Sequence, residues 1–354
     1  MNPYLRKCVD AAEGYVPGEQ PAPGQAVTKL NTNENPYPPS PRLVEVLEGW
    51  EIDRLRIYPD PLSKALRAAA SEAWHHPVEG IVAGNGSDEI LAMLFRAALD
   101  PGERVVFADP SYILYDTLAR LFGGTPVPVP CGEDFALPGN LAEVPGKLVL
   151  LASPNPPAGR AFSNETVDAV CRARKGQGIV VVDEAYADFA DHSSLPLLSE
   201  HENLVVVRTL SKSYGLAGLR VGFALGNAPV LAGLWKVRDS YNVDALAQAL
   251  AAAALLNQAY FSERVATIRR DRNHLRDRLL DLGFAVPPSD ANFVFASHPE
   301  MGGREVYDAL RARGILVRHF TPAKMAHGVR ITVGSPEQNE RLLAALNDIL
   351  TAKV

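Results

Sequence analysis

Five short apolar runs constrain the fold of this chain more than any other feature. They recur between about residues 65 and 235, and segments with helical periodicity separate them. Runs this continuous are typical of strands buried on both faces, which occur mainly in parallel sheets covered by helices. The sequence therefore predicts an α/β fold with a mainly parallel, doubly wound sheet. The runs are Ile81-Val-Ala, Arg104-Val-Val-Phe-Ala, Lys147-Leu-Val-Leu-Leu-Ala, Gly178-Ile-Val-Val-Val and Leu204-Val-Val-Val.

The pattern changes after about residue 240, which predicts a second domain. A long amphipathic helix ends at Gly283, and short strands follow near residues 293, 315 and 329 among further helices. A chain of 354 residues also exceeds what one core usually supports. The first forty residues are rich in proline and glycine, as in an extended arm. We expect an arm over residues 1–35 on the small domain or a dimer partner, a large domain over 36–240 and a small α+β domain over 241–354.

Composition argues against several classes of function. A formal net charge of −6 and a pI near 5.8 disfavour nucleic-acid binding. The alanine-rich run over residues 244–256 contains Gln248 and is too short to span a bilayer. Three widely spaced cysteines predict neither a disulfide framework nor a zinc site, and the histidines show no ligand spacing. We expect no metal, no membrane partner and a cytoplasmic location.

The segment Thr209-Leu-Ser-Lys-Ser-Tyr-Gly-Leu-Ala-Gly-Leu-Arg220 predicts a site for a small molecule with two functional groups. It follows a buried strand directly, and open α/β sheets bind ligands at the carboxyl ends of their strands. The amine of Lys212 can condense with a carbonyl group. Thr209, Ser211 and Arg220 can hold a phosphate through hydroxyl donors and a charged guanidinium. A cofactor that carries both an aldehyde and a phosphate is pyridoxal 5′-phosphate, held as a Schiff base.

Other strand ends carry residues that such a site needs. Asp183 ends an apolar strand, where it can pair with a protonated pyridine nitrogen; helix capping is the plainer alternative for this residue. Tyr186 can donate to the phenolic oxygen. Tyr112 can stack on the ring, although taken alone it would more often be a core residue. Asn155 offers an amide side chain from a proline-rich loop. Gly86, Ser87 and Asp88 begin a predicted helix whose amides point at a phosphate.

These segments resemble the fold-type I pyridoxal-phosphate aminotransferases, within them most closely the histidinol-phosphate branch. The resemblance covers nearly the whole chain. It includes Asn31-Thr-Asn-Glu-Asn-Pro-Tyr-Pro-Pro-Ser-Pro41, Tyr58-Pro-Asp-Pro61, Gly86-Ser-Asp-Glu89, Asp183-Glu-Ala-Tyr186, Thr209-Leu-Ser-Lys212, Gly218-Leu-Arg220 and Val329-Arg-Ile-Thr-Val-Gly334.

The resemblance implies a role for each matching residue. Lys212 is implied as the Schiff-base lysine and proton shuttle, Asp183 as the partner of the ring nitrogen and Tyr186 as the donor to the phenolic oxygen. Tyr112 is implied to stack on the ring. Ser87, Asp88, Thr209, Ser211 and Arg220 are implied to surround the cofactor phosphate. Tyr58 would reach the site of a neighbouring protomer in a homodimer, and Arg330, assisted by Arg318 and Tyr15, would bind the anionic group of the substrate.

One loop departs from the family pattern. The family reads Ser-Pro-Asn-Asn-Pro-Thr-Gly and uses its second asparagine on the phenolic oxygen. Here those asparagine and threonine positions hold Pro156 and Ala158, so Asn155 becomes the candidate for this contact.

The expected reaction is transamination of L-histidinol phosphate with 2-oxoglutarate, which yields imidazole acetol phosphate and L-glutamate. Two arginines suit a substrate that carries a phosphate in place of a carboxylate. An aromatic aminotransferase and a threonine-phosphate decarboxylase remain alternatives on the same scaffold, because they differ in pocket shape. A non-catalytic ligand sensor is the alternative from another class, although the chain shows no appended basic helix-turn-helix segment.

Overall fold

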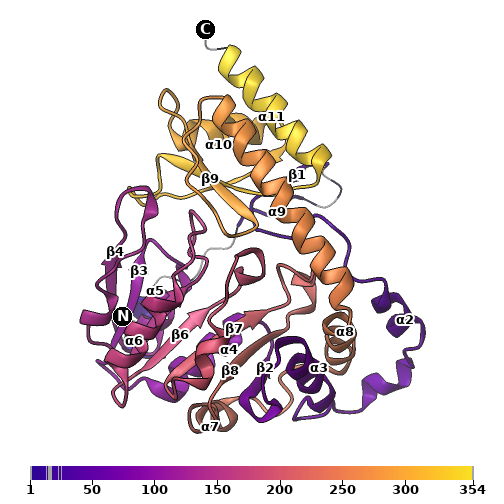
Figure 1. Cartoon of the computed structure of the whole chain (residues 1–354), viewed down its shortest axis with the longest axis vertical. Helices are drawn as coiled ribbons and strands as arrows, with labels where there is room; N and C mark the ends of the chain where they lie inside the picture. The colour runs from indigo at the N-terminus through magenta and orange to yellow at the C-terminus, as the bar shows by residue number, and fades with distance from the viewer. Residues whose placement is uncertain (1, 13, 15–17, 23, 25, 353–354) are drawn as a thin grey trace.

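A seven-stranded sheet forms the centre of the larger part of the molecule (Figure 1). The computed structural model describes residues 2–12, 14, 18–22, 24 and 26–352. The strands follow the order β2-β8-β7-β6-β5-β3-β4, and all are parallel except β8, which is antiparallel to both neighbours. The predicted mainly parallel sheet is therefore confirmed. Its strands are β2 (Ile81–Gly84), β3 (Arg104–Asp109), β4 (Thr125–Pro130), β5 (Leu148–Ala152), β6 (Ile179–Asp183), β7 (Leu204–Thr209) and β8 (Gly222–Gly226).

Helices cover both faces of this sheet, which explains why its strands are apolar throughout. In β6, Val180 and Val182 pack into one buried cluster while Val181 packs into the other. Alternate residues of a strand point to opposite faces, so a strand covered on both sides has no polar face. One face carries α4 (Ser87–Ala98), α5 (Leu114–Leu121) and α7 (Ala228–Val237), and the other carries α2 (Arg42–Glu48), α3 (Lys64–Trp74), α6 (Asn164–Arg174) and α8 (Ala245–Leu255).

Two strands of the sheet were not among the five predicted runs. In β4, Pro126, Pro128 and Pro130 alternate with other residues, so the segment does not have a strand composition. Proline cannot donate to the ladder, but β4 lies at the edge of the sheet, and among the described residues β3 is its one partner strand. The short strand β8 lies between Gly222 and Gly226 and directly follows the loop that contains Arg220.

The C-terminal part forms a second layer above the sheet (Figure 1). Its antiparallel sheet has the order β11-β12-β9, built from β9 (Phe293–Ser297), β11 (Arg318–His319) and β12 (Gly328–Thr332). The helices α9 (Gln258–Asp281), α10 (Gly303–Ala312) and α11 (Pro336–Thr351) surround it. Gly283 directly follows the C-cap of α9 and has a φ of 83°, so the predicted helix end is confirmed.

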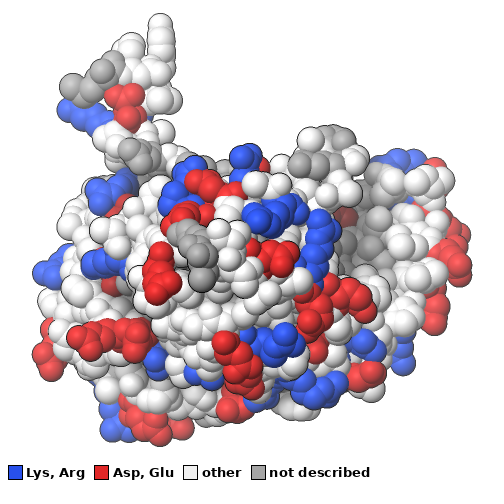
Figure 2. Space-filling view, turned by 90° about the horizontal axis from the view of Figure 1, so that it is seen from above, with Lys and Arg blue, Asp and Glu red and all other residues white. Residues whose placement is uncertain are grey.

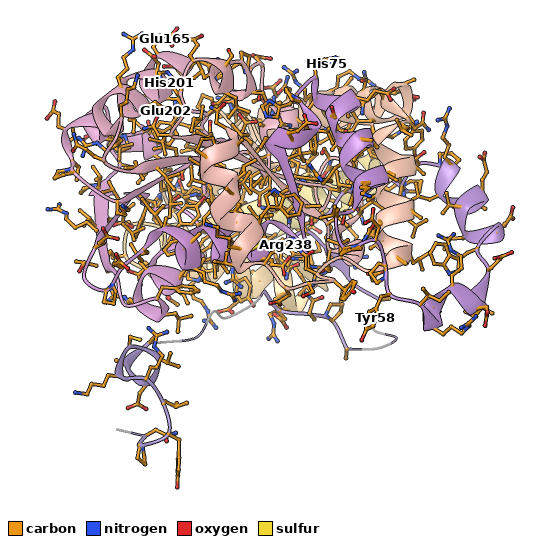
Figure 3. The ribbon with its side chains drawn as sticks, turned by 90° about the horizontal axis from the view of Figure 1, so that it is seen from below. Tyr58, His75, Glu165, His201, Glu202 and Arg238 are labelled. Carbon is orange, nitrogen blue, oxygen red and sulfur yellow. The ribbon has the colours of Figure 1, made fainter. Side chains whose placement is uncertain are left out.

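The N-terminal arm contacts both parts of the molecule. Its strand β1 (Thr28–Lys29) pairs in parallel with β10 (Ile315–Leu316), and Leu30 is buried in the C-terminal core. The first residues, including α1 (Lys7–Ala11), project from the body (Figure 3), although the Cys8 thiol approaches the Leu121 carbonyl oxygen at the end of α5.

The packing of α8 bears on where the two cores separate. Ala247, Leu250 and Ala251 of this helix are buried in the same cluster as α3 and the large sheet. Val265 and Ile268 of α9 are buried in the C-terminal cluster. By packing, the chain passes from one core to the other within α9. The division into domains stays a prediction.

Lys and Arg side chains are interspersed with Asp and Glu over the face drawn in Figure 2. Of the helices within the described ranges, none is both long and apolar enough to cross a bilayer.

Candidate active site

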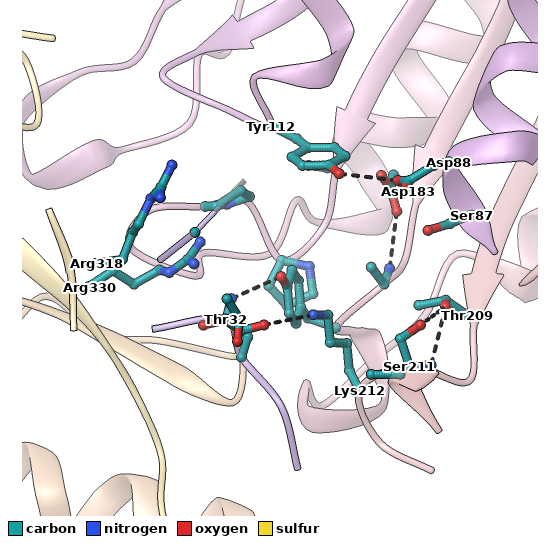
Figure 4. Close-up of a pocket in the computed structure, with 18 of the residues that line it drawn as sticks. Thr32, Ser87, Asp88, Tyr112, Asp183, Thr209, Ser211, Lys212, Arg318 and Arg330 are labelled. Carbon is teal, nitrogen blue, oxygen red and sulfur yellow. Dashed lines mark hydrogen bonds between the residues drawn. The ribbon is translucent and has the colours of Figure 1, made fainter. Parts of the chain in front are cut away.

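A cavity opens where the carboxyl ends of β5, β6 and β7 meet the arm and the small sheet (Figure 4). This is the edge at which open α/β sheets bind ligands. Most of the residues predicted for the site line this cavity. They are Ser87, Asp88, Tyr112, Asp183, Tyr186, Thr209, Ser211, Lys212, Arg220, Arg318 and Arg330, joined by Gly18, Asn31, Thr32 and Asn33 of the arm.

Lys212 lies in the loop after β7, with its amine directed at the arm. Its Nζ donates to the Thr32 carbonyl oxygen at 3.0 Å and lies 5.9 Å from the centre of the Tyr186 ring. The Asn35 side chain holds the backbone of this loop by donating to the carbonyl oxygens of Lys212 and Ser213. The arm thus positions the amine as well as the loop that carries it.

Asp183 lies at the end of β6 and is buried at the base of the cavity. Its Oδ2 accepts a hydrogen bond from the Tyr115 hydroxyl at 2.8 Å, and its Oδ1 accepts one from the Ala185 amide. Burial raises the pKa of the Asp183 carboxyl to about 6, although both hydrogen bonds oppose this shift. Such a carboxylate gains stability from a cationic partner, which a protonated ring nitrogen would provide.

A cradle for an anion lies at the N-terminus of α4. Gly86 caps this helix with a φ of 88°, and a Cβ atom there would lie 2.5 Å from Nη2 of Arg220. Arg220 donates to the Ser211 hydroxyl and pairs with Asp88 at 3.4 Å. The Thr209 and Ser211 hydroxyl oxygens are 3.0 Å apart. Helix amides, two hydroxyls and a guanidinium together suit a phosphate group.

Two tyrosines lie on different sides of this cavity. The Tyr112 hydroxyl donates to Asp88 Oδ1 at 3.1 Å. The Tyr186 hydroxyl accepts a hydrogen bond from Asn33 Nδ2 at 2.9 Å, and its ring packs edge-on against Phe293. Both tyrosines therefore border the space between Asp183 and Lys212 without filling it.

Arg318 and Arg330 lie side by side on neighbouring strands of the small sheet (Figure 4). They are direct partners in the β11–β12 register, so both side chains leave the same face of that sheet. Arg330 also donates to the Asn31 carbonyl oxygen at 3.1 Å. The two guanidinium groups form a concentrated positive charge on the side of the cavity opposite the anion cradle.

Of the predicted residues that the structure describes, Gly86, Asn155 and Tyr58 lie outside the cavity lining. Asn155 is buried, donates to the Pro110 carbonyl oxygen and accepts from the Ser111 hydroxyl, so its amide is engaged away from the cavity. Tyr58 is 78% exposed and stacks on Tyr241 at 4.4 Å. Tyr15 falls outside the described residues.

Several residues that shape the site were not among those predicted from the sequence. Thr32 and Asn33 lie in the arm motif, but nothing in the sequence shows that the arm folds back onto Lys212. Tyr115 lies in α5 and its hydroxyl donates to Asp183 of β6, a contact between distant segments that no local sequence pattern indicates.

Comparisons with known proteins agree with this geometry. Residues 25–346 match the model of the family described as aminotransferase class I and II. The chain belongs to this family. Histidinol-phosphate aminotransferase 1 of Trichormus variabilis is 44% identical over 99% of this chain and 100% of its own length. The histidinol-phosphate aminotransferase of Geobacter sulfurreducens is 45% identical with the same coverage.

A solved aminotransferase structure matches the fold over almost its full length. The crystal structure of histidinol-phosphate aminotransferase from Sinorhizobium meliloti in complex with pyridoxal 5′-phosphate superposes with a TM-score of 0.89 at 26% identity. The alignment covers 99% of each chain. The fold class and the aminotransferase family predicted from the sequence are confirmed.

Proposed function

We propose that this aminotransferase transfers the amino group of L-histidinol phosphate to 2-oxoglutarate, with pyridoxal 5′-phosphate as its cofactor. The observation that carries this proposal is the pair Arg318 and Arg330, which faces the cavity that also contains Lys212. Paired guanidinium groups suit a phosphate dianion. Two relatives that are 44% and 45% identical over 99% of this chain are named histidinol-phosphate aminotransferase.

The residues of the cavity fit the proposed cofactor. Arg220 packs against the bare Cα of Gly86, in space that a Cβ would fill, and leaves the α4 amides beside a guanidinium. The buried Asp183 carboxylate is available to a cationic ring nitrogen. Lys212 supplies the amine that links to the aldehyde. When bound, the cofactor supplies an electron sink that stabilises negative charge on the α-carbon of the substrate.

Each residue then has a defined part in the reaction. Asp183 holds a proton at the ring nitrogen, and Tyr115 keeps the carboxylate oriented. Lys212 Nζ, which donates to the Thr32 carbonyl oxygen here, would be freed from the aldehyde carbon when the substrate amine takes its place. The free amine would then take the proton from the α-carbon and return it to the carbon that carried the aldehyde. Arg318 and Arg330 bind the anionic end of each substrate, phosphate in one half-reaction and carboxylate in the other.

Single-turnover absorbance spectra test this proposal. The cofactor-loaded enzyme is mixed in turn with histidinol phosphate, glutamate, phenylalanine, tyrosine and threonine phosphate. Histidinol phosphate and glutamate should convert the cofactor to its amine form, with histidinol phosphate preferred over the aromatic amino acids. A preference for phenylalanine would support the aromatic aminotransferase instead, and release of carbon dioxide from threonine phosphate would support the decarboxylase.

We also propose a homodimer in which Tyr58 reaches the site of the partner subunit. Its support is a set of exposed apolar side chains on α2 and the segment after it, including the short helix η1 (Ile52–Arg56). Such patches commonly mark protein interfaces. Sedimentation analysis of Leu55→Asp should show dissociation, whereas Leu280→Asp, an exposed leucine on α9, should not. The set comprises Val44, Leu47, Ile52, Leu55, Ile57, Tyr58 and Leu62, and the exposed Tyr241, from the segment before α8, stacks on Tyr58.

A cytoplasmic location completes the proposal. Cys8, Cys131 and Cys171 are all free thiols, as expected in a reducing compartment. Cell fractionation tests it, and recovery of the protein outside the cytoplasm would contradict it.

A further inference from the structure

Arg318 and Arg330 occupy a position that a sheet does not normally favour. They are directly opposite each other on β11 and β12, with side chains on one face. Like charges in directly opposite positions destabilise a strand pair. A bound anion relieves this repulsion, and between turnovers neighbouring groups must hold both side chains in place.

The ring of Phe320 lies close to both guanidinium groups. Its centre is 5.6 Å from Cζ of Arg318 and 5.5 Å from Cζ of Arg330. Both distances fall within the range of cation–π attraction. Phe293 adds a second ring beside Arg330, at 5.2 Å. The electron-rich ring faces therefore offset part of the repulsion between the two arginines.

Phe320 is itself held firmly. It is 9% exposed and belongs to a small apolar cluster with Phe135, Phe295, Met325 and Ala158. Phe135 reaches this cluster from the large-sheet side, and its ring packs edge-on against Phe295 with centres 4.9 Å apart. A ring packed in this way has little freedom to turn, so it presents a fixed surface to the arginines.

We propose that Phe320 is a positioning residue for substrate recognition: its ring holds Arg318 and Arg330 together as one binding site for the anionic group. Because the arginines bind anions in both half-reactions, the role of Phe320 covers both substrates. This inference rests on the proposed function, since it assigns anion binding to the same two arginines.

The test compares steady-state kinetics of Phe320→Leu with a matched control. The leucine keeps an apolar side chain but removes the ring. Phe284→Leu makes the same change in the C-terminal core, where the ring packs on His298. We expect KM for both histidinol phosphate and glutamate to rise about tenfold in Phe320→Leu, with kcat retained. Phe320→Tyr, which keeps the ring, should restore the wild-type KM.

A double-mutant cycle separates positioning from general support of the fold. Once Arg318→Ala has removed one guanidinium, Phe320→Leu should raise KM by a clearly smaller factor than it does in the wild type. Equal factors in both backgrounds would overturn the proposal, as would an unchanged KM or a rise of similar size in Phe284→Leu. If Phe320→Leu does not fold, Phe320→Met, which fills the same space with an unbranched side chain, is judged by the same outcomes.

The glutamate measurements keep this test distinct from that of the proposed function. If the wild type fails to use histidinol phosphate, the substrate proposal is wrong, yet the effect of Phe320 on the KM for glutamate still decides this inference.

Discussion

Replacing Lys212 with alanine should abolish the reaction while leaving the fold intact. The variant has no amine to link to the cofactor and none to move the proton, so turnover should fall by orders of magnitude. The visible absorbance of the lysine-linked cofactor should disappear as well. Lys175→Ala, an exposed lysine after α6, serves as the control and should behave like the wild type. Near-normal turnover by Lys212→Ala would exclude its assigned role.

Asp183 should make the stability of the cofactor-free protein depend on pH. Its pKa is about 6 in the folded protein, against 3.8 as the ordinary value. The folded state therefore binds the proton more tightly, and this contribution is complete below pH 3.8 and lost as the pH rises through 6. The loss should be on the order of 3 kcal/mol in the free energy of unfolding.

Urea unfolding between pH 4 and pH 7 measures this effect as the difference between wild type and Asp183→Asn, which cannot titrate. Tyr115→Phe removes the hydrogen bond that favours the ionised Asp183 carboxylate, so the pKa of Asp183 should rise further in this variant. The fall in stability with rising pH should then continue to a higher pH than in the wild type. A difference between wild type and Asp183→Asn that does not vary with pH would show that the carboxyl is not strongly perturbed.

At the scale of elements, the anion cradle depends on close packing between β8 and the start of α4. A Cβ atom on Gly222 would lie 2.4 Å from the Ser87 amide nitrogen and 2.5 Å from the carbonyl carbon of Gly86. Both are backbone atoms and cannot turn aside as a flexible side chain could. The absence of a side chain at Gly222 therefore lets the start of α4 pack directly on β8.

Gly222→Ala should accordingly weaken cofactor binding. Overpacking typically costs about 1–3 kcal/mol of folding stability, and the displaced cradle should also bind the cofactor phosphate more weakly. Titration of the cofactor-free protein with pyridoxal phosphate measures this change. Gly218→Ala is the matched control, because a Cβ there meets no atom within 4 Å. Equal affinities for the two variants would mean that the cradle adapts to the added methyl group.

At the scale of the whole molecule, the proposed homodimer predicts complementation between two defective variants. If Tyr58 acts in the partner's site, each site takes Lys212 from one subunit and Tyr58 from the other. Lys212→Ala and Tyr58→Ala each remove one of these two residues. A mixed dimer then contains one site with an intact Lys212 and an intact Tyr58. Unfolding and refolding the two variants together should give more activity than the sum of the two refolded separately.

The control for this experiment pairs Lys212→Ala with Asp183→Asn. Both residues line the same cavity of one subunit, so no mixed dimer regains a complete site. If the Tyr58 mixture gains no more activity than this control, Tyr58 acts within its own subunit or has no part in the site.

Much of the site could be predicted because its residues follow strand ends. The runs before Asp183 and Lys212 are long and apolar enough to identify as strands, and parallel strands bring their carboxyl ends to one edge. The placement of Asn155 could not be predicted, because its partners Pro110 and Ser111 come from a different loop. A side chain in a loop takes its direction from such contacts, which local sequence does not encode.

Local pattern was enough to predict the parallel sheet, the lysine after β7, the acid after β6 and the glycine turn before α4. Other contacts depend on how the whole chain packs: Thr32 and Asn33 of the arm meet Lys212 and Tyr186, and Phe320 lies beside both arginines. These contacts join segments far apart in the chain. They form because burying the apolar surfaces of the arm and the small sheet stabilises one arrangement of the whole molecule. The periodicity of residues within one segment does not predict that arrangement.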